Sequence, residues 1–351
     1  MPLESFEIVR VLLLSAVAFV LAFAWAPLLT KWLREFKMGK SIRTMGDAPV
    51  FARLHAKKSG TPTMGGLLIW VTVFFLAVVL AQITPYLPEG SMLARLNFLS
   101  RSETWLPMGA LVASAIVGFI DDYFNVKGIG PKGGGLRMRH RLMIYALIAI
   151  VGAWWFRVKL DWDILHVPFV GDFNIGIWYV PFFIFVIVAT SFSVNEADGL
   201  DGLAGGTLMT SFGAFAIIAF AQGHYDLAVF CGVILGALLA FLWFNIHPAA
   251  FFMGDTGAMS LGVTLGIVAL LTNSALYLPI IGFVFVLESL SVFAQIFSKR
   301  VLKKKFLKSA PFHHHLEAIG WPEPQIVMRL WVVSIVFASI GVSLALLDVL
   351  I

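Results

Sequence analysis

The chain has 351 residues, of which 60% are apolar and 13% are charged, and its formal net charge is +5. Because this small share of charged residues cannot cover the surface of a soluble protein, the composition predicts a polytopic membrane protein. The basic net charge does not indicate nucleic-acid binding, because the basic residues lie in loops and no soluble domain displays them. The single Cys231 lies in an apolar run, which excludes an intrachain disulfide and a cysteine metal site.

A membrane-spanning helix needs roughly 20 apolar residues. Ten candidate runs lie near residues 8 to 30, 63 to 84, 104 to 120, 142 to 157, 176 to 194, 204 to 222, 226 to 244, 256 to 272, 276 to 297 and 326 to 348. The first run is expected to be a retained helix and not a signal peptide, because Glu4 and Glu7 precede it and apolar residues continue to Leu29. We expect an all-α protein with about ten transmembrane helices in a single integral-membrane domain over residues 1 to 351.

Lysine and arginine concentrate in three loops. Residues 31 to 58 carry eight, residues 127 to 141 carry five and residues 299 to 308 carry six. Basic residues of short loops stay on the cytoplasmic side, so these loops predict one cytoplasmic face and, with an even number of spans, two external (periplasmic) termini. Contact with anionic lipid is the simpler explanation of the basic residues alone.

Acidic residues gather on the same predicted face, at the ends of apolar runs: Asp121, Asp122, Asp198, Asp201 and Asp255. Magnesium is usually held by one or two carboxylates, with waters and substrate phosphates completing its shell. Asp122 and Asp255 are candidate ligands, which leaves Asp121 as a base or nucleophile. For each cluster alone, helix capping or solvation is the alternative.

Two further polar segments suit a phosphate or nucleotide ligand. A helix that begins near Gly254 and Asp255 would favour a phosphate at its N-terminus, with a capped turn as the equal alternative. Asn245 ends an apolar run with an amide able to bind a base or sugar, or to cap the helix. On a helical turn, Asp198 and Asp201 would point the same way.

Three consecutive histidines, His313, His314 and His315, follow Pro311 and Phe312. Consecutive helical residues point about 100° apart, and neither cysteines nor an HExxH string accompany them, which disfavours zinc. Histidines that donate to phosphate or sugar oxygens are the favoured interpretation, and a structural cluster is the alternative.

Together these motifs resemble phospho-N-acetylmuramoyl-pentapeptide transferases, from about residue 20 to the C-terminus. The motifs, in matching order, are TPTMGG (61 to 66), GFIDDY (118 to 123), the stretch from Asn195 to Gly206, FLWFN (241 to 245), MGD (253 to 255) and APFHHHLE (310 to 317). The wider superfamily of polyprenyl-phosphate hexose-1-phosphate transferases shares the aspartates, and the histidine stretch favours the muramoyl-pentapeptide branch.

The resemblance implies a magnesium-dependent enzyme of the bacterial inner membrane, often a homodimer. It would move phospho-MurNAc-pentapeptide from UDP-MurNAc-pentapeptide to undecaprenyl phosphate, giving lipid I and UMP in peptidoglycan synthesis. Its active site would lie at the cytoplasmic face of the lipid bilayer. A sibling enzyme that uses UDP-GlcNAc, a secondary transporter and a lipid scaffold are the alternatives.

The resemblance also implies roles for individual residues. Asp121 would deprotonate the lipid phosphate, Asp122 would be a companion acid and Asp255 the magnesium ligand. The uridine-diphosphate site would contain Lys58, Asp198, Asp201, Asn245 and Phe252. An adjoining polar pocket would contain Asn195, Thr63 and Gly254. The sugar-peptide end would contain Gln295, His313, His314 and His315.

The chain departs from the family pattern at several positions. Glu196 and Ala197 replace a usual Leu-Thr pair, and Glu196 is expected to face solvent. Asn125 stands where lysine often follows the DDY motif, and Tyr145 stands where glutamine is common. These changes leave the expected reaction intact, either as direct attack by the lipid phosphate or in two steps through an aspartyl intermediate.

Overall fold

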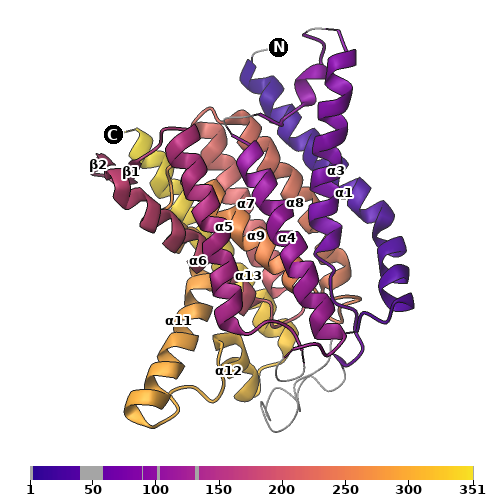
Figure 1. Ribbon diagram of the computed structural model, residues 1–351, viewed down its shortest axis with the longest axis vertical. Helices are drawn as coiled ribbons and strands as arrows, with labels where there is room; N and C mark the ends of the chain where they lie inside the picture. Colours follow the sequence, from indigo (N-terminus) through magenta and orange to yellow (C-terminus); the bar gives the residue numbers. More distant parts are fainter. Residues whose placement is uncertain (1–2, 40–57, 89, 101–102, 131–133, 351) are drawn as a thin grey trace.

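A computed structural model of the chain describes residues 3–39, 58–88, 90–100, 103–130 and 134–350 (Figure 1). The basic loops expected at 31 to 58 and 127 to 141 lie partly outside the described residues. The α-helices are α1 (Leu3–Glu35), α3 (Leu67–Ile83), α4 (Trp105–Val126), α5 (Met138–Lys159), α6 (Tyr179–Ala197), α7 (Leu203–Ala221), α8 (Tyr225–Asn245), α9 (Gly254–Leu271), α10 (Leu278–Ile281), α11 (Phe283–Phe297), α12 (Phe312–Ala318) and α13 (Glu323–Val349). Short 3-10 turns lie at Thr84–Tyr86, Ala94–Leu96 and Gly176–Trp178, and a π-helical turn lies at Ser298–Leu302.

Nine helices in the described part of the chain are long and apolar enough to cross a membrane. They confirm a largely helical polytopic membrane protein and coincide with nine of the ten expected runs. The remaining run, 276 to 297, is not the single continuous helix that was expected, because Gly282 divides it into α10 and α11, neither of which alone reaches the length of a span. Pro279 lies in the first turn of the short α10, where a missing amide is tolerated, and Gly282 ends the helix.

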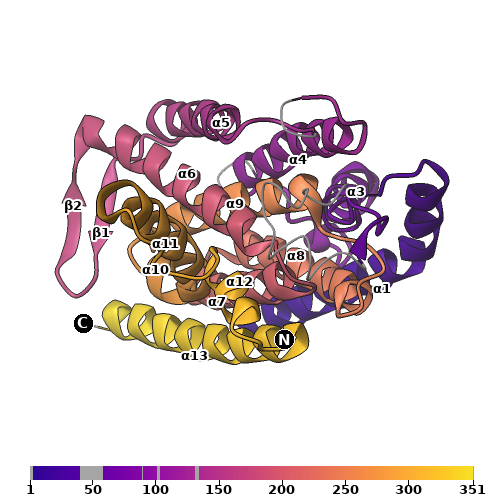
Figure 2. The ribbon, with the colours of Figure 1, turned by 90° about the horizontal axis from the view of Figure 1, so that it is seen from below.

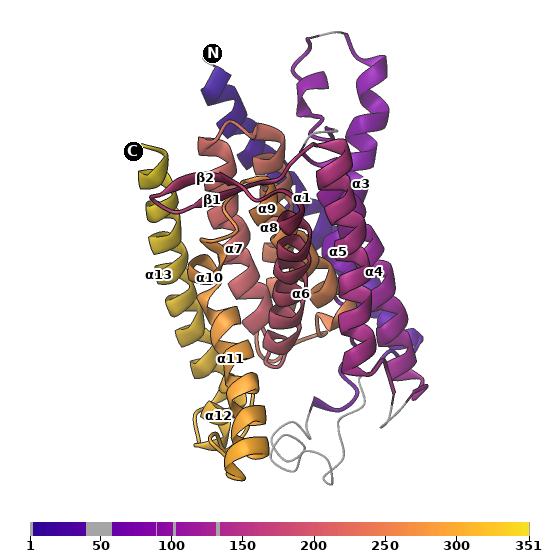
Figure 3. The same cartoon turned by 60° about the vertical axis from the view of Figure 1, so that its left-hand side comes forward.

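A β-hairpin is the other departure from an all-α fold. Strands β1 (Ile164–Val167) and β2 (Gly171–Asn174) pair antiparallel between α5 and α6. Figure 3 shows the hairpin reaching across the molecule to the C-terminal end of α13. Four-residue strands are too short for the apolar pattern that marked the helices.

The core is built around α8 and α9. In α9, 94% of the residues of the span are buried, against 22% in α1. Helix α9 packs against α4 and α6, and α8 packs against α1 and α7. Seen from below, α5 and α13 lie along opposite edges of the bundle (Figure 2). The outer helices therefore leave more of their apolar side chains exposed than α9, whose first residues lie among its neighbours.

Glycines bring the central helices into close contact. A Cβ at Gly236 of α8 would lie 2.0 Å from the Ser15 carbonyl oxygen of α1. A Cβ at Gly262 of α9 would lie 2.7 Å from the Ser191 Cα atom of α6. Small residues at helix contacts let backbones approach in a membrane, where apolar burial alone does not favour association of helices.

Both termini lie at one end of the bundle (Figure 1). The opposite end carries α12, the start of α9 and α13, and the last residues of α4, α6 and α8. The clusters of acidic residues therefore meet at the end away from the termini. Which of the two ends is cytoplasmic remains a prediction from the loop charges.

The hairpin is held to α13 by a charged contact at the terminal end. Nδ1 of His166 lies 2.7 Å from Oδ1 of Asp172, and its Nε2 lies 2.6 Å from Oδ2 of Asp348. The Phe169 amide donates to Asp348 Oδ1 at 2.9 Å, and the His166 amide donates to the Asn273 side chain at 3.1 Å. Partial burial acts to lower the pKa of His166, but the two carboxylates outweigh it and raise the pKa above its usual value.

This geometry predicts that hairpin docking weakens at alkaline pH. Because the folded-state pKa of His166 is raised, its contribution is complete below the unfolded pKa of about 6.5 and is lost as pH rises through the folded pKa. Asp348 also accepts a hydrogen bond from Tyr277, which keeps part of the contact. Hydrogen exchange of residues 164 to 174, corrected for intrinsic rates, should be slower at pH 6 than at pH 9. In His166→Asn this pH difference should disappear, and its persistence would contradict the assignment.

Candidate active site

Asp121 and Asp255 are joined by one guanidinium group. Nη2 of Arg141 lies 2.5 Å from Asp121 Oδ2 and 2.7 Å from Asp255 Oδ2. Asn195 donates from Nδ2 to Asp255 Oδ1 at 2.5 Å and accepts from Arg141 Nη1 at 3.2 Å. The Leu136 amide donates to Asp121 Oδ1 at 2.5 Å. We call Asp121, Asp255, Arg141 and Asn195 the carboxylate centre.

Four different helices supply these side chains, which places the centre at a junction. Asp121 lies in the last turns of α4, Arg141 in the first turn of α5, Asn195 near the end of α6, and Asp255 is the second residue of α9. Close packing of α4 on α9 depends on Gly118, since a Cβ there would lie 2.3 Å from the Asp255 carbonyl oxygen. The expectation of a helix beginning at Gly254 is confirmed, whereas Asp255 is not its N-cap.

Asp122 faces the start of α9 and binds its backbone. Its Oδ2 accepts from the Thr256 amide at 3.0 Å, and Thr63 Oγ1 lies 3.4 Å from its Oδ1. A carboxylate at a helix N-terminus satisfies a free amide and interacts favourably with the helix dipole. Asp122 therefore has a structural role in holding α4 to α9, beside the metal-binding role expected from the sequence.

The donor atoms of the carboxylate centre suit a hard divalent cation. Magnesium prefers carboxylate and water oxygens, and Asp121, Asp122 and Asp255 supply carboxylates at one junction. Oδ2 of Asp121 is buried without a hydrogen bond among the described residues, although the Arg141 cation lies next to it. These residues therefore fit the expected magnesium, with Arg141 as a fixed cation in the same place.

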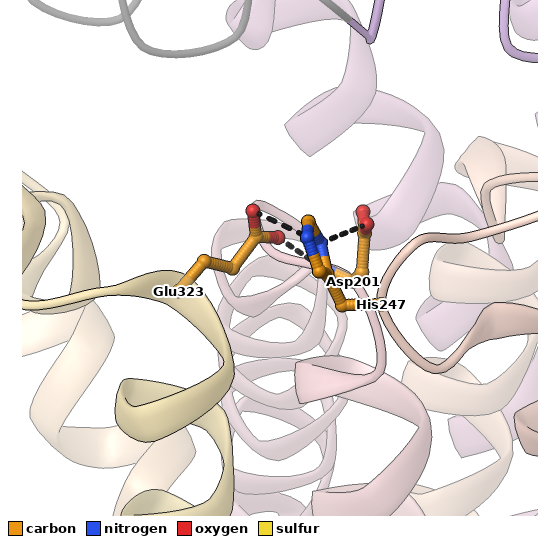
Figure 4. Close-up of side chains that lie close together, drawn as sticks. All are labelled: Asp201, His247 and Glu323. Carbon is orange, nitrogen blue, oxygen red and sulfur yellow. Dashed lines mark hydrogen bonds and ion pairs between the residues drawn. The ribbon is translucent and has the colours of Figure 1, made fainter.

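A second charged cluster surrounds Lys58. Its Nζ lies 2.6 Å from Asp201 Oδ1 and 2.5 Å from Glu323 Oε1. His247 Nδ1 lies 2.9 Å from Asp201 Oδ2 and 3.5 Å from Glu323 Oε2, and Figure 4 shows the imidazole between the two carboxylates. We call Lys58, Asp201, His247 and Glu323 the lysine cluster.

Three members of the lysine cluster have the spacing of a metal site. Ligand atoms of Asp201, His247 and Glu323 lie within 4.8 Å of one another. The expected ligands, Asp122 and Asp255, are not members of this group. Lys58 contacts the two carboxylates of the lysine cluster, whereas three carboxylates, those of Asp121, Asp122 and Asp255, surround the single Arg141. The larger excess of negative charge makes the carboxylate centre the better magnesium candidate.

Two other expected nucleotide-site residues adjoin the lysine cluster. Lys58 Nζ lies 5.9 Å from the centroid of the Phe252 ring, within the range of a cation–π contact. Asn245 is buried at the end of α8, where it accepts from the Gly202 amide at 2.9 Å and donates to the Phe251 carbonyl at 2.8 Å. Asn245 thereby holds the chain beside Asp201 and beside Phe252, which is a positioning role.

Asp198 and Asp201 do not share a helical turn, contrary to the expectation from their spacing. Asp198 ends α6, and Asp201 lies in the turn before α7. The Asp198 amide donates to the Asn195 carbonyl at 3.3 Å, so the turn starts beside the carboxylate centre. It ends at Asp201 in the lysine cluster. Repeated glycines allow the tight connection that the helical interpretation missed.

The three histidines contact three different partners in and beside α12. His313 is buried, and its Nδ1 lies 3.0 Å from Oε2 of the buried Glu288. Burial acts to lower the pKa of His313, but the Glu288 carboxylate outweighs it and raises the pKa above its usual value. His314 Nδ1 lies 2.7 Å from Glu317 Oε2, and His315 Nδ1 accepts from the Lys308 amide at 3.2 Å. Separate partners favour hydrogen bonding over zinc.

Gln295 and Gly199 connect this region to the rest of the protein. Gln295 is buried and binds the backbone of Phe306 and Leu307, so it supports the loop before α12. A Cβ at Gly199 would lie 2.2 Å from His313 Nε2, so this histidine packs on the turn between Asp198 and Asp201. The described contacts give Gln295 a structural role.

Sequence reasoning missed Arg141, His247, Glu323 and Glu288. In the sequence, Arg141 is one of several basic residues in a loop, and Glu323 lies just before the last apolar run without any mark of its own. Glu323 contacts Lys58 across 265 positions of the chain, a pairing that no local pattern contains. Glu196 is half-buried and acts electrostatically on His313, so the expectation that it simply faces solvent is wrong.

A helical bundle with carboxylates, amides and fixed cations at one end defines a multi-pass membrane protein with a site suited to phosphate chemistry. The model described as Glycosyl transferase family 4 matches residues 104–273, which supports a phospho-sugar transferase. The phospho-N-acetylmuramoyl-pentapeptide-transferase signature 1 matches residues 58–69.

Three relatives carry the same name over nearly the whole chain. The phospho-N-acetylmuramoyl-pentapeptide-transferase of Chloroflexus aurantiacus is 38% identical, covering 97% of this chain and 91% of its own length. Those of Geobacillus sp. (strain WCH70) and Geobacillus kaustophilus are 38% and 39% identical, each covering 95% of this chain and 97% of its own length. The chain belongs to the phospho-N-acetylmuramoyl-pentapeptide transferase family.

Gly254→Ala should disturb the start of α9. The added Cβ would lie 2.5 Å from Asp122 Oδ2 and 2.7 Å from Thr63 Oγ1, at a φ of +73°. We expect a loss of roughly 1–3 kcal/mol of stability, measured by thermal unfolding in detergent. Gly223→Ala is the matched control, because its φ is +81° and its Cβ would meet open space. Equal losses in the two variants would show that the contacts with Asp122 and Thr63 do not matter.

Arg141→Met should destabilise the protein by about 3–5 kcal/mol, because it leaves buried carboxylates without their counter-charge. Arg157→Met, on the same helix, removes a partly exposed pair with Asp163 and should cost about 0–1 kcal/mol. Thermal unfolding of the two variants and the wild type, with and without Mg²⁺, measures these losses of stability. Because a divalent cation can replace the guanidinium charge, Mg²⁺ should restore stability in Arg141→Met more than in Arg157→Met. Equal responses would count against cation binding at the carboxylate centre.

Proposed function

We propose that the chain transfers phospho-MurNAc-pentapeptide from UDP-MurNAc-pentapeptide to undecaprenyl phosphate, giving lipid I and UMP. The observation that carries this proposal is the junction of Asp121, Asp255, Asn195 and Arg141 at one end of a membrane-spanning bundle, in a chain of this family. A lipid phosphate and a water-soluble nucleotide sugar can meet only at such an end.

The reaction we propose is direct attack by the lipid phosphate. An oxygen of undecaprenyl phosphate bonds to the sugar-linked phosphorus, and the bond from that phosphorus to the bridging oxygen breaks. UMP leaves with the electron pair of that bond. Asp121, buried and fixed by the Leu136 amide, takes the proton of the lipid phosphate when that group arrives protonated. A two-step route through an aspartyl intermediate is the competing mechanism.

Asp255 and Asp122 would hold Mg²⁺, which supplies charge neutralisation on the pyrophosphate when bound. Arg141 adds a fixed positive charge beside Asp121 and Asp255, in a site largely closed to water, where preorganised charges act strongly. Asn195 fixes the Asp255 carboxylate by donating to it. Thr63 and Gly254 complete the polar wall, because only a residue without a Cβ fits between Thr63 and Asp122.

The lysine cluster is proposed to bind the uridine diphosphate. Lys58 offers a cation, and Phe252 beside it offers a ring on which a base can stack. Asp201 orients Lys58, while Asn245 and the Asp198 turn hold the surrounding backbone. His313, His314, His315 and Gln295 would lie toward the sugar and peptide, with Gln295 acting through the loop that it supports.

The protein is further proposed to lie in the bacterial inner membrane as a homodimer, in a single integral-membrane domain. The carboxylate centre would face the cytoplasm, and both termini would be periplasmic. A secondary transporter is disfavoured, because its charged residues are expected near the bilayer midplane, whereas here they gather at one end of the helices.

The test is UMP release by purified protein from UDP-MurNAc-pentapeptide and undecaprenyl phosphate, with and without Mg²⁺. Asp255→Asn should reduce the rate at least about 100-fold, because it removes a ligand and a charge at the reacting phosphates. Asp161→Asn is the control, since Asp161 is exposed at the opposite end and its positive φ suits asparagine. Release from UDP-GlcNAc alone would assign the sibling reaction, and no release from either donor would contradict the proposal.

A further inference from the structure

Tyr145 carries a buried hydroxyl close to the carboxylate centre. It lies on α5 one turn after Arg141, so both side chains share one face of the helix. Tyr145 is 1% exposed, and its hydroxyl has no hydrogen-bond partner among the residues that the structure describes. A buried hydroxyl without a partner is unfavourable unless another group binds there.

The surroundings of the Tyr145 hydroxyl are charged. It interacts electrostatically with Asp255, Arg141, Asp121 and Glu196. Tyr145 is therefore part of the region where the proposed reaction takes place, rather than part of the apolar core.

A second unsatisfied donor lies on the same helix face. Nε of Arg141 is buried and makes no hydrogen bond within the described part of the chain, although Nη1 and Nη2 bind Asn195 and Asp255. The Arg141 Nε–H can only donate, and the Tyr145 hydroxyl can donate as well as accept. A group with several acceptor oxygens, such as a phosphate, can accept from both.

Tyr179 shows what a buried tyrosine looks like in a different role. It is also 1% exposed, and its hydroxyl likewise has no hydrogen-bond partner among the described residues, but it packs against the rings of Phe156 and Phe183 at the start of α6. That end of α6 lies opposite the carboxylate centre (Figure 3). The comparison separates an aromatic packing role from the charged environment of Tyr145.

We propose that the Tyr145 hydroxyl and the Arg141 Nε–H bind nonbridging oxygens of a substrate phosphate, which makes Tyr145 a further substrate-binding residue. This inference rests on the proposed function. The phosphate belongs either to the pyrophosphate of the nucleotide-sugar donor or to the monoester of the lipid acceptor. Magnesium itself is a poor partner for a neutral phenol, because it prefers carboxylates and water.

The test compares Tyr145→Phe with Tyr179→Phe, since each removes only a hydroxyl. Rates are measured with either substrate varied and the other saturating. A hydrogen bond to a charged group is worth about 1.5–3 kcal/mol, so kcat/KM should fall roughly 10- to 100-fold in Tyr145→Phe. Tyr179→Phe should stay within about twofold. Tyr145→Gln keeps a donor and should retain more activity than Tyr145→Phe.

The substrate whose KM rises identifies the source of the phosphate. Unfolding temperature distinguishes binding from structure, because Tyr145→Phe removes an unsatisfied group and should be at least as stable as the wild type. An unchanged kcat/KM for both substrates would overturn the inference. A change confined to the Mg²⁺ concentration that gives the half-maximal rate would also overturn the inference. A loss of stability in Tyr145→Phe that accounts for the lost activity would overturn it as well.

A binding measurement keeps this inference separate from the proposed function. Calorimetry with inorganic pyrophosphate and Mg²⁺ needs no turnover, and Tyr145→Phe should weaken binding about 10-fold while Tyr179→Phe leaves it unchanged. If the wild type releases no UMP yet shows this difference, the proposed reaction fails and the phosphate contact stands. If UMP is released but neither kinetics nor binding responds to Tyr145→Phe, only the phosphate contact fails.

Discussion

The structure depends on the compensation of buried negative charge at the end of an apolar bundle. Asp121 is fully buried and Asp255 is partly buried, with 13% of its side chain exposed, and an isolated carboxylate in such a place is unfavourable. Arg141 contacts both, and because it comes from α5 while they come from α4 and α9, the same contact joins three helices. The requirement for counter-charge thus determines how the ends of these helices meet.

Close helix packing makes this arrangement possible. Gly118 lets α4 approach the first turn of α9, and Gly254 leaves room for the Asp122 carboxylate beside Thr63. With larger side chains at these two positions, Asp122 could not reach the Thr256 amide. Packing of small residues, which in the rest of the bundle only holds helices together, here sets the positions of reactive groups.

Much of the fold follows from the sequence because apolar runs of sufficient length have one stable form in lipid. Nine spans and the meeting of the acidic clusters at one end were predictable on that basis. The break at Gly282 was not, since a single glycine and Pro279 interrupt an otherwise apolar run. The hairpin was also missed, because its docking depends on His166 and Asp348, which are 182 positions apart.

The residues of the candidate site likewise include some that the sequence predicts and others that it does not. Asp121, Asp122 and Asp255 stand out because carboxylates are rare in apolar sequence, and Asn195 and Lys58 became recognisable only within motifs. Their partners have no such mark: Arg141, His247 and Glu323 look like ordinary loop or helix-end residues until the fold brings them together. Residue chemistry is visible in sequence, whereas charge pairing between distant segments is a property of the folded chain.

The two charge clusters differ in balance, and this difference suits two parts of one substrate. Asp121 and Asp255 of the carboxylate centre, together with the neighbouring Asp122, outnumber Arg141, which leaves an excess of negative charge that a divalent cation can balance. A pyrophosphate would be repelled there without that cation. In the lysine cluster, Lys58 already contacts both acids and lies beside an aromatic ring. Under the proposed function, a nucleotide would therefore bind at the lysine cluster through a resident cation, and its phosphates would reach the carboxylate centre together with a metal.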